Sequence, residues 1–283
     1  MSKDNIKLFV HKERIPLTFM KFPAGETLVR IESNSAIRLY NNEKLCGMIN
    51  LDFKDNGDLI DLMLLVDAVR REYIQGIKLS LSMSYLPYSR QDRVCNKGES
   101  LSVKVVTDII NSLGFVNVYC KDIHSEVGVS LINNLRHIDM IACTRSLSMM
   151  FNAETTVLVS PDAGANKKLL NFAKDYGFNQ LVRADKERDL STGKITGTKV
   201  YAEPQGDKDF LILDDIADGG YTFIELAKKL RELTTGKIYL YVTHGIFSKG
   251  IDILYPLFDK VYCSNIMLDN WKEKDTHNIL VEV

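Results

Sequence analysis

One segment in the second half of the chain most constrains its fold. The apolar run at residues 210–213 has the pattern of a buried strand, and two acidic residues, Asp214 and Asp215, follow it directly. After the glycine pair Gly219 and Gly220, apolar residues recur with the spacing of an amphipathic helix, at positions 223, 226, 227 and 230. A strand, an acidic glycine loop and a helix in this order predict an open α/β sheet, whose ligands bind beyond the carboxyl ends of its strands.

The residue types in this segment favour a phosphorylated sugar as the ligand. Backbone N–H groups in a glycine loop and at a helix N-terminus attract a phosphate. Two adjacent carboxylates would repel that phosphate, and they suit a sugar diol or a metal ion instead. On these residues alone, an ordinary acidic turn between a strand and a helix is also compatible with the pattern.

Strand-like and helical patterns alternate along the whole chain. Strand-like runs occur at residues 77–85, 116–123, 156–160, 208–213 and 237–243. Helical patterns occur at residues 59–73, 101–113 and 165–176. This alternation predicts mainly parallel sheets covered by helices, and its rhythm favours two comparable α/β domains, at residues 1–142 and 143–283.

Composition narrows the class of protein. Of the 283 residues, 45% are apolar and 26% are charged, which is typical of a soluble globular enzyme. The net charge of −1 gives no electrostatic reason to expect nucleic-acid or membrane partners. The five cysteines form no C-x-x-C pair, and the N-terminus lacks the apolar core of a signal peptide. We therefore expect a cytoplasmic enzyme without a disulfide framework or a zinc site.

Two loops of the first half carry candidate binding residues. The charged loop at residues 88–93 contains Arg90, Gln91 and Arg93. Two arginines and a glutamine can grip a polyphosphate and an adenine edge, although a solvated charged loop has the same composition. His124 ends the next strand-like run, and a lone histidine is more often structural than functional.

Two segments of the second half add candidate charges. Asp162 follows the strand-like run at residues 156–160, where its carboxylate can hold a hydrated Mg²⁺ or serve the backbone of the turn. The polar stretch at residues 184–197 contains Lys186 and Arg188, and on its own it predicts a solvated hairpin.

These segments occur in the order of a known family. Residues 214–222 resemble the ribose-phosphate signature shared by type I phosphoribosyltransferases and ribose-phosphate pyrophosphokinases, also called phosphoribosyl-pyrophosphate (PRPP) synthetases. The order Pro-Tyr-x-Arg-Gln-Asp-Arg at residues 87–93 is typical of the pyrophosphokinases, and simple phosphoribosyltransferases lack it. Further similar segments lie at residues 22–26, 122–124, 160–165, 185–188 and 243–248. The chain is thus identified as a member of the PRPP synthetase family.

The resemblance implies a fold and an activity. The fold is two tandem domains like those of type I phosphoribosyltransferases, each a mainly parallel sheet flanked by helices. The first domain would bind ATP and carry oligomer contacts, and the second would bind ribose phosphate and carry a catalytic loop. The enzyme would be an ATP-dependent diphosphotransferase that moves the β,γ-diphosphoryl group of ATP to the 1-hydroxyl of ribose 5-phosphate, giving PRPP and AMP. Mg²⁺ would accompany ATP, and the protein would form a homo-oligomer.

Residue roles carry over from the same resemblance. Lys186 and Arg188 would be the catalytic residues, and His124 and Asp162 would bind Mg²⁺. The ATP-binding residues would be Phe22, Glu26, Arg90, Gln91, Asp92 and His124, with Phe22 and Glu26 serving the site of a neighbouring subunit. The ribose-phosphate-binding residues would be Asp162, Asp214, Asp215, Asp218, Gly219, Gly220, Tyr221 and Thr222. The resemblance assigns no catalytic role to His244, which we expect to be structural.

The chain departs from the family pattern at two places. Ala24 stands where the family has an aspartate, and Gly219 to Thr222 replace a loop that normally reads Thr, small residue, Gly, Thr. Two interpretations of Tyr221 stay open. Either its ring points away and the two glycines restore the phosphate cradle, or the ring stacks on a second base of a 5′-extended substrate, such as ADP-ribose in NAD metabolism. A type I phosphoribosyltransferase and an inactive PRPP-synthetase-associated subunit are two further functions that the pattern leaves open.

Overall fold

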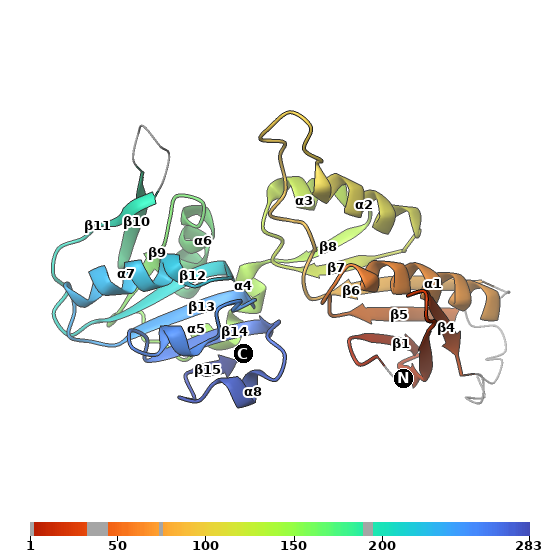
Figure 1. Ribbon diagram of the computed structural model, residues 1–283. Helices are drawn as coiled ribbons and strands as arrows, with labels where there is room; N and C mark the ends of the chain where they lie inside the picture. Colours follow the sequence, from red (N-terminus) through yellow and green to blue (C-terminus); the bar gives the residue numbers. More distant parts are fainter. Residues whose placement is uncertain (1–2, 33–44, 74–75, 189–194) are drawn as a thin grey trace. The chain divides into compact units, whose positions relative to one another are not determined.

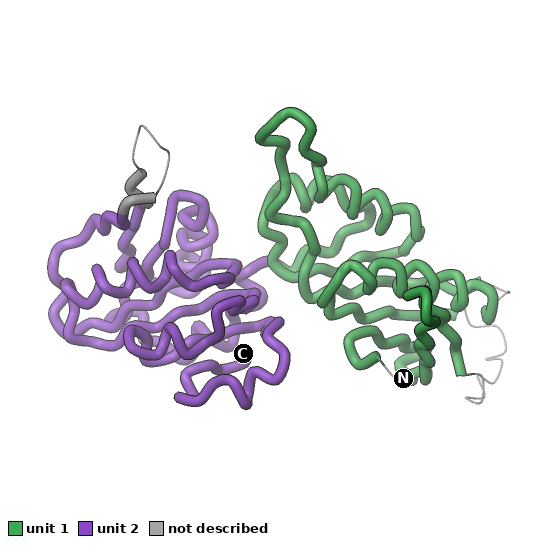
Figure 2. The backbone as a smooth tube through the Cα atoms, viewed as in Figure 1, with its two compact units in different colours: residues 1–138 green, residues 139–283 purple. Residues whose placement is uncertain are grey.

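The computed structural model describes residues 3–32, 45–73, 76–188 and 195–283, with the backbone alone at residues 186–188 and 195–196. The chain forms two compact units, Met1–Ile138 (unit 1) and Asp139–Val283 (unit 2), as Figure 2 shows. The division lies after residue 138, whereas the sequence rhythm put it after residue 142. Unit 1 has one hydrophobic core, and unit 2 has two, on opposite faces of its main sheet.

Unit 1 is built on a six-stranded sheet with the strand order β2-β1-β5-β6-β7-β8. Its first three strands by position are β2 (Glu13–Ile15), β1 (Ile6–Val10) and β5 (Leu45–Leu51). The remaining three are β6 (Ile77–Met83), β7 (Val118–Lys121) and β8 (Leu135–Ile138). Strands β5 to β8 run parallel, and β1 is antiparallel to both β2 and β5.

The three helices in the described residues of unit 1 lie on the same face of this sheet, as Figure 1 shows. They are α1 (Gly57–Glu72), α2 (Ser102–Ser112) and α3 (Glu126–Leu131). The strands β5, β6, β7 and β8 are neighbours in sequence order, and right-handed crossovers that always step in one direction place every helix on one side. The core lies between this face and the helices, whereas no helix among the described residues of unit 1 covers the opposite face.

Unit 2 contains a seven-stranded sheet with the order β11-β10-β9-β12-β13-β14-β15. On one side of the sheet order lie β11 (Ile195–Tyr201), β10 (Leu181–Arg188) and β9 (Thr156–Ser160). On the other lie β12 (Asp209–Ala217), β13 (Ile238–Gly245), β14 (Lys260–Ile266) and β15 (Leu280–Glu282). Only the pairing of β10 with β11 is antiparallel among these described strands.

The strand order of unit 2 reverses direction between β9 and β12. From β9 the chain passes through α6 (Asn166–Tyr176) to β10, and from β12 it passes through α7 (Tyr221–Arg231) to β13 on the other side. The two helices therefore cover opposite faces, and alternate residues of each central strand pack into two separate cores. A reversal of this kind opens a crevice for a ligand at the carboxyl ends of the two strands.

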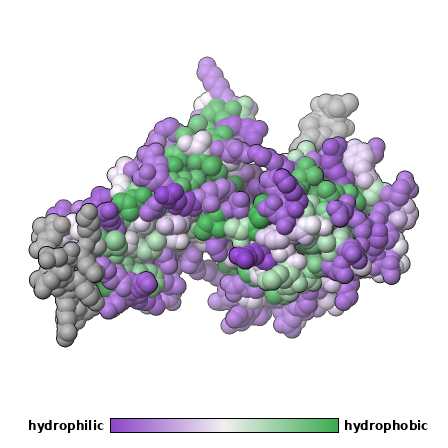
Figure 3. Space-filling view, turned by 180° about the vertical axis from the view of Figure 1, so that it is seen from behind, coloured by the Kyte–Doolittle hydropathy of each residue, from purple (hydrophilic) through white to green (hydrophobic). Residues whose placement is uncertain are grey.

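Short helices complete unit 2. They are α4 (Met140–Cys143), α5 (Arg145–Ser148), the 3₁₀ helix η1 (Asp252–Leu254) and α8 (Trp271–Lys274). None of the helices in the described ranges has both the length and the apolar character needed to cross a bilayer. Seen from behind, the surface is mostly hydrophilic, with hydrophobic side chains gathered in patches on both units (Figure 3).

The predicted fold class is confirmed, since both sheets are mainly parallel and carry helices. One prediction needs refinement. The apolar pattern ended the strand before Asp214, but β12 continues to Ala217, so Asp214 and Asp215 lie within the strand. Pairing with β13 explains the extension, because Asp214 is in register with Val242, and Ile216 with the buried His244. Backbone pairing, which hydropathy does not report, keeps these polar residues extended.

The start of α1 is fixed by a buried carboxylate, Asp58. Asp58 is fully buried, accepts hydrogen bonds from the backbone N–H groups of Lys54 (2.7 Å) and Asp55 (3.2 Å), and pairs with the Lys3 ammonium. Burial by itself raises the pKa of Asp58, but these hydrogen bonds outweigh it, so the pKa lies below its ordinary value. This contribution to stability is therefore present above the ordinary carboxyl pKa of about 3.9 and is lost as the pH falls through the folded-state pKa.

We expect Asp58→Ala to lower the free energy of unfolding by about 1–3 kcal/mol, because it leaves two backbone donors without their acceptor and removes one of the two carboxylates that pair with Lys3. Urea unfolding at pH 7 measures this change. Asp67→Ala on the same helix is the matched control, since Asp67 is 62% exposed in its pair with Arg71 and should change stability by no more than about 0.5 kcal/mol. Equal losses in the two variants would contradict the role given to Asp58.

Candidate functional site

Three carboxylates lie at the carboxyl ends of β9 and β12, where the strand order of unit 2 reverses. Asp214 and Asp215 lie on β12, and Asp162 follows the last residue of the adjacent β9. Ile212 is in register with Val159, so these carboxylates leave neighbouring strands at the same level. The reversal that α6 and α7 create thus places acidic groups where an α/β sheet binds its ligand.

Asp214 and Asp215 have different surroundings. Lys168 of α6 lies 2.9 Å from Asp215 Oδ2, and Asp215 is only 7% exposed. Asp214 Oδ1 accepts a hydrogen bond from the Asp215 backbone N–H at 2.9 Å. Burial, followed by the charge of Asp215, raises the pKa of Asp214 well above its ordinary value, with a smaller contribution from Asp162. A ligand that donates hydrogen bonds or carries positive charge would relieve this repulsion.

Asp162 holds the turn that leads into α6. Its Oδ1 accepts hydrogen bonds from the backbone N–H groups of Gly164 (3.0 Å) and Ala165 (3.2 Å). The Ser160 hydroxyl donates to the Asp162 carbonyl at 2.8 Å, which fixes the same turn from the strand side. The backbone role that the sequence left open is therefore present, and it holds the carboxylate in place at the ligand edge.

The glycine loop between β12 and α7 is compact. Gly220 has a φ of 77° and caps α7, and a Cβ there would meet Ile253 Cδ1 at 3.2 Å, so both space and conformation favour glycine. The Ser248 N–H donates to the Asp218 carbonyl, which ties the loop to the segment after β13. Tyr221 opens the eleven-residue helix α7 and is 72% exposed. The helix N-terminus and the loop amides together suit an anion.

Lys186 and Arg188 lie on β10, next to β9, in an antiparallel hairpin with β11. Lys186 is in register with Thr198 and Arg188 with Ile195, and the register shifts between residues 187 and 188. The hairpin that the polar stretch predicted is thus present. Residues 189–194 lie outside the described residues, as do the side chains of Lys186 and Arg188.

Unit 1 contains a second polar site at the carboxyl end of its sheet. A cavity of about 690 Å³ is lined by Arg90, Gln91, Asp92, Arg93, Cys95, Glu99, Ser100, Ser102 and His124. The loop after β6 and the end of β7 thus bring together four of the predicted ATP-binding residues. Their proximity follows from the parallel pairing of β6 with β7, because both loops leave the same edge.

Charged side chains that line this cavity form hydrogen bonds with one another and with the backbone. Arg93 Nε lies 3.0 Å from Asp92 Oδ1, and this hydrogen bond is the main reason that the pKa of Asp92 lies below its ordinary value. The charge of His124 lowers it further. Glu99 accepts hydrogen bonds from the backbone N–H groups of Cys95 and Asn96, both at 2.9 Å, which closes the far side of the loop.

Phe22 and Glu26 do not line this cavity. They lie at the turn of a separate hairpin, β3 (Leu17–Lys21) and β4 (Thr27–Ile31), where the Phe22 N–H donates to the Glu26 carbonyl at 2.9 Å. Phe22 is 43% exposed, and β4 packs beside α1.

Sequence reasoning missed Lys168, Glu99 and Cys95. Lys168 gives no local pattern beyond a lysine in the first turn of a helix, and only the fold shows that it reaches Asp215. Glu99 and Cys95 follow the charged loop within ten residues, so their place in the cavity could have been inferred from proximity to Arg90.

The protein is thus a tandem α/β protein in which each unit has polar side chains at the carboxyl edge of a mainly parallel sheet. Residues 3–114 match the family described as the N-terminal domain of ribose phosphate pyrophosphokinase. The ribose-phosphate pyrophosphokinase of Pyrococcus furiosus is 30% identical over 261 residues, which cover 90% of this chain and 88% of that protein. Ribose-phosphate pyrophosphokinase 2 of Archaeoglobus fulgidus is 28% identical over 185 residues, which cover 65% of this chain and 60% of that protein.

A solved structure agrees with the fold. Phosphoribosylpyrophosphate synthetase from Mycobacterium smegmatis superposes with a TM-score of 0.76 at 20% identity, covering 95% of this chain and 86% of that one. The chain belongs to the ribose-phosphate pyrophosphokinase family. The predicted family is therefore confirmed, while the roles of individual residues stay predictions.

Proposed function

We propose that the protein is an ATP-dependent diphosphotransferase that makes PRPP from ribose 5-phosphate. The anomeric 1-hydroxyl attacks the β-phosphorus of ATP, the bond from the β-phosphorus to the oxygen of the α-phosphate breaks, and AMP leaves. The observation that carries this proposal is the carboxylate cluster Asp214, Asp215 and Asp162 beside the N-terminus of α7 in unit 2. The carboxylates can accept hydrogen bonds from the ribose diol, and the neighbouring backbone amides can donate to a phosphate. These two groups match the two ends of ribose 5-phosphate.

Roles in unit 2 follow from this fit. The carboxylates of Asp214 and Asp215 accept hydrogen bonds from the ribose hydroxyls, and Lys168 holds the Asp215 carboxylate in place. Residues Asp218 to Thr222 surround the 5-phosphate with loop amides and the helix N-terminus. Lys186 and Arg188 neutralise charge on the transferring diphosphoryl group.

The unit 1 cavity takes the nucleotide. Arg90 and Gln91 hold the phosphates and the adenine edge, while Asp92 orders Arg93 for the same task. Phe22 lies on a hairpin outside this cavity, which supports a role in the site of a neighbouring subunit. A homo-oligomer stays a prediction, and a sedimentation mass near 32.1 kDa would contradict it.

The described side chains supply too few ligands for Mg²⁺ by themselves, so the ion would bind together with the nucleotide. Among the described residues, no group of three or more His, Cys, Asp or Glu side chains could hold a metal ion. Mg²⁺ commonly takes one or two protein ligands, several waters and substrate phosphates. His124 and Asp162 would each contribute one such ligand, and the ion would supply charge neutralisation to the ATP phosphates.

A substrate panel tests the proposal. The purified protein is mixed with Mg–ATP and either ribose 5-phosphate or ADP-ribose, and the products are identified by mass. AMP and PRPP are expected with ribose 5-phosphate, and release of AMP with ADP-ribose as the acceptor would show that a 5′-extended ribose is also a substrate. Consumption of added PRPP without use of ATP would instead indicate a phosphoribosyltransferase, and no turnover of any substrate would indicate an inactive subunit.

ADP-ribose is a second candidate substrate, which the exposure of Tyr221 favours. Its ring opens α7 beside the proposed 5-phosphate cradle and is 72% exposed, so it could stack on the second base of a 5′-extended ribose. If so, Tyr221→Thr should lower kcat/KM for ADP-ribose by about tenfold and leave that for ribose 5-phosphate within about twofold. Steady-state kinetics on both substrates measure this, with Tyr255→Thr as a control at another exposed ring. Equal effects on both substrates would remove Tyr221 from base recognition.

A further inference from the structure

The loop that carries Arg90 and Gln91 contains a strained backbone. Tyr88 has a φ of 63°, in the left-handed region that residues with large side chains rarely adopt. It lies two residues before Arg90, which lines the proposed nucleotide cavity of unit 1. Strain of this kind persists only where the surrounding structure holds it, and it is concentrated at functional sites. The contacts of Tyr88 therefore show what holds this loop.

One side-chain hydrogen bond ties Tyr88 to the start of α1. The Tyr88 hydroxyl donates to Asn56 Oδ1 at 2.7 Å, across 32 positions of the sequence. Asn56 directly precedes α1, where an asparagine usually accepts a hydrogen bond from a backbone N–H group of the helix. Within the described helix α1, its side chain makes no such bond. The Asn56 side chain thus serves Tyr88 instead of the helix.

The same loop is fixed at its other end. The Gln91 N–H donates to the Tyr88 carbonyl at 2.9 Å, which closes a tight turn around Arg90. The Gln91 carbonyl accepts a hydrogen bond at 3.3 Å from the N–H of Val103, in the first turn of α2. The loop is therefore attached to α1 through Tyr88 and to α2 through Gln91, on both sides of a residue that lines the cavity.

We propose that Tyr88 is a positioning residue of the nucleotide site. Its hydroxyl, bound to Asn56, keeps the backbone at positive φ, and this conformation sets the direction in which Arg90 and Gln91 leave the loop. Tyr88 is not among the residues that line the cavity, so it acts through these two neighbours and not on the nucleotide. This role rests on the proposed function, because the cavity of unit 1 must be the site of ATP.

Ser89, the next residue, is held in an unfavourable place by the same turn. It is 1% exposed, and its hydroxyl has no hydrogen-bond partner among the described residues. A buried hydroxyl without a partner destabilises the folded state. A turn that combines a left-handed tyrosine with such a hydroxyl is locally unstable, as is expected where a conformation serves binding.

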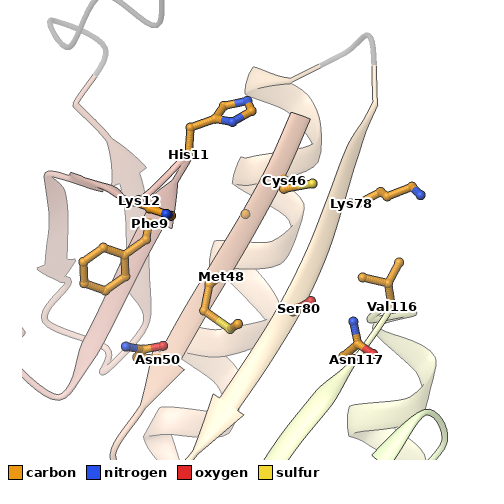
Figure 4. Close-up of a pocket in the computed structure, with 11 residues that line it drawn as sticks. Phe9, His11, Lys12, Cys46, Met48, Asn50, Lys78, Ser80, Val116 and Asn117 are labelled. Carbon is orange, nitrogen blue, oxygen red and sulfur yellow. The ribbon is translucent and has the colours of Figure 1, made fainter. Parts of the chain in front are cut away.

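An exposed thiol, Cys95, makes occupation of the nucleotide cavity measurable. Cys95 lines this cavity, so bound Mg–ATP should slow its alkylation, and the ATP concentration that halves the rate gives an apparent Kd. The rates are measured on the full chain by peptide mass mapping. Another cavity of unit 1, which Figure 4 shows, has Cys46 in its lining and shares no lining residue with the nucleotide cavity. Peptide mapping therefore reports the two cavities separately.

Tyr88→Phe keeps the ring and removes the hydroxyl. We expect it to raise the apparent Kd and the KM for ATP by about fivefold, the effect of one lost hydrogen bond, and to keep kcat within about twofold. Asn56→Ala should have the same effect, and the double variant should add no more, since both changes remove one interaction. Asn56→Asp keeps an acceptor for the hydroxyl and should retain the wild-type Kd within about twofold.

Two further variants are matched controls. Tyr73→Phe removes the hydroxyl of a buried tyrosine at the opposite end of α1, and it should leave the apparent Kd for ATP unchanged. Ser89→Ala removes the buried hydroxyl next to Tyr88, so it should raise the Tm and keep the Kd within about twofold. A purely structural role for Tyr88 would instead lower the Tm of Tyr88→Phe without changing its Kd for ATP.

Two results distinguish the role of Tyr88 from the nucleotide site on which it rests. If ATP protects Cys95 equally well in the wild type, Tyr88→Phe and Asn56→Ala, the positioning role is wrong and the nucleotide site stands. If ATP does not protect Cys95 in the wild-type protein, the cavity does not hold the nucleotide, and both the site and the role of Tyr88 are overturned. Additive losses in the double variant would also contradict the role, because the two side chains would then act through separate contacts.

Discussion

Lys186→Ala is expected to lower kcat by about 10³-fold while changing the Kd for ATP by less than about threefold. Phosphoryl transfer depends mainly on positioning and on neutralising the charge of the transferring group, and a well-placed cation supplies roughly 10³–10⁵ in rate. Lys186 lies on β10, the strand next to β9, whose end carries Asp162. A cation that acts only in the transition state affects turnover and leaves the binding of ATP nearly intact.

The measurement pairs single-turnover formation of AMP with equilibrium binding of ATP. Lys199→Ala is the matched control, because Lys199 is exposed on the partner strand β11, in register with Asp185 of the same hairpin. It should retain kcat within about twofold. If Lys186→Ala raised the Kd for ATP in proportion to its loss of kcat/KM, Lys186 would be a binding residue with no special role in the transition state.

Hydrophobic periodicity predicted the central elements of both units well. Leu62, Leu65, Val66 and Val69 lie on the buried face of α1, as their spacing predicted, and Thr156–Ser160 is β9 with the bounds that the apolar run indicated. One face of α1 and every residue of β9 are buried, so burial alone determines their apolar pattern.

The N-terminal hairpins of unit 1 were not predicted. β1 and β2 are joined by His11 and Lys12 at positive φ, and these residues give no turn pattern of the usual Asn-Gly type. β4 alternates half-buried and exposed residues, and Phe19 is the one buried residue of β3, so the apolar contrast of both strands is weak. Pairing between strands, rather than burial, holds these segments.

The candidate sites were predictable to different depths. Sequence order indicated which loops leave the ligand edge, and for the loops after β6 and β7 the structure brings Arg90, Gln91, Asp92 and His124 into one cavity. The sequence could not indicate that Lys168 pairs with Asp215, because these residues are 47 positions apart and only the crossover from β9 to α6 brings them together. Nor could it show an uncovered sheet face, which follows from the order of strands rather than from any one segment.

Asp214→Asn should make the protein more stable and much less active. The folded protein raises the pKa of Asp214 well above its ordinary value, chiefly through burial and then through the charge of Asp215. The folded state therefore binds the Asp214 proton more tightly than the unfolded state does. Stability from this group is complete below the ordinary carboxyl pKa of about 3.9 and falls as the pH rises toward the folded-state value.

The asparagine variant cannot ionise, so its Tm should fall less between pH 5 and pH 8 than that of the wild type, and it should exceed the wild-type Tm at pH 8. Asp175→Asn, at an exposed position of α6, is the control and should follow the wild-type curve. Turnover should fall by about 10²-fold, because the amide cannot replace an anionic acceptor for the ribose hydroxyls.

If the site works as proposed, Asp214→Asn must raise the Tm at pH 8 and lower the turnover. A carboxylate held in the folded state against burial and a like charge is destabilising unless a ligand supplies donors or positive charge. Saturating ribose 5-phosphate with Mg²⁺ should therefore raise the wild-type Tm at pH 8 more than the Tm of Asp214→Asn. Equal ligand-induced shifts in both proteins would mean that Asp214 does not face the bound sugar, and the ribose site would then have to lie away from this edge of β12.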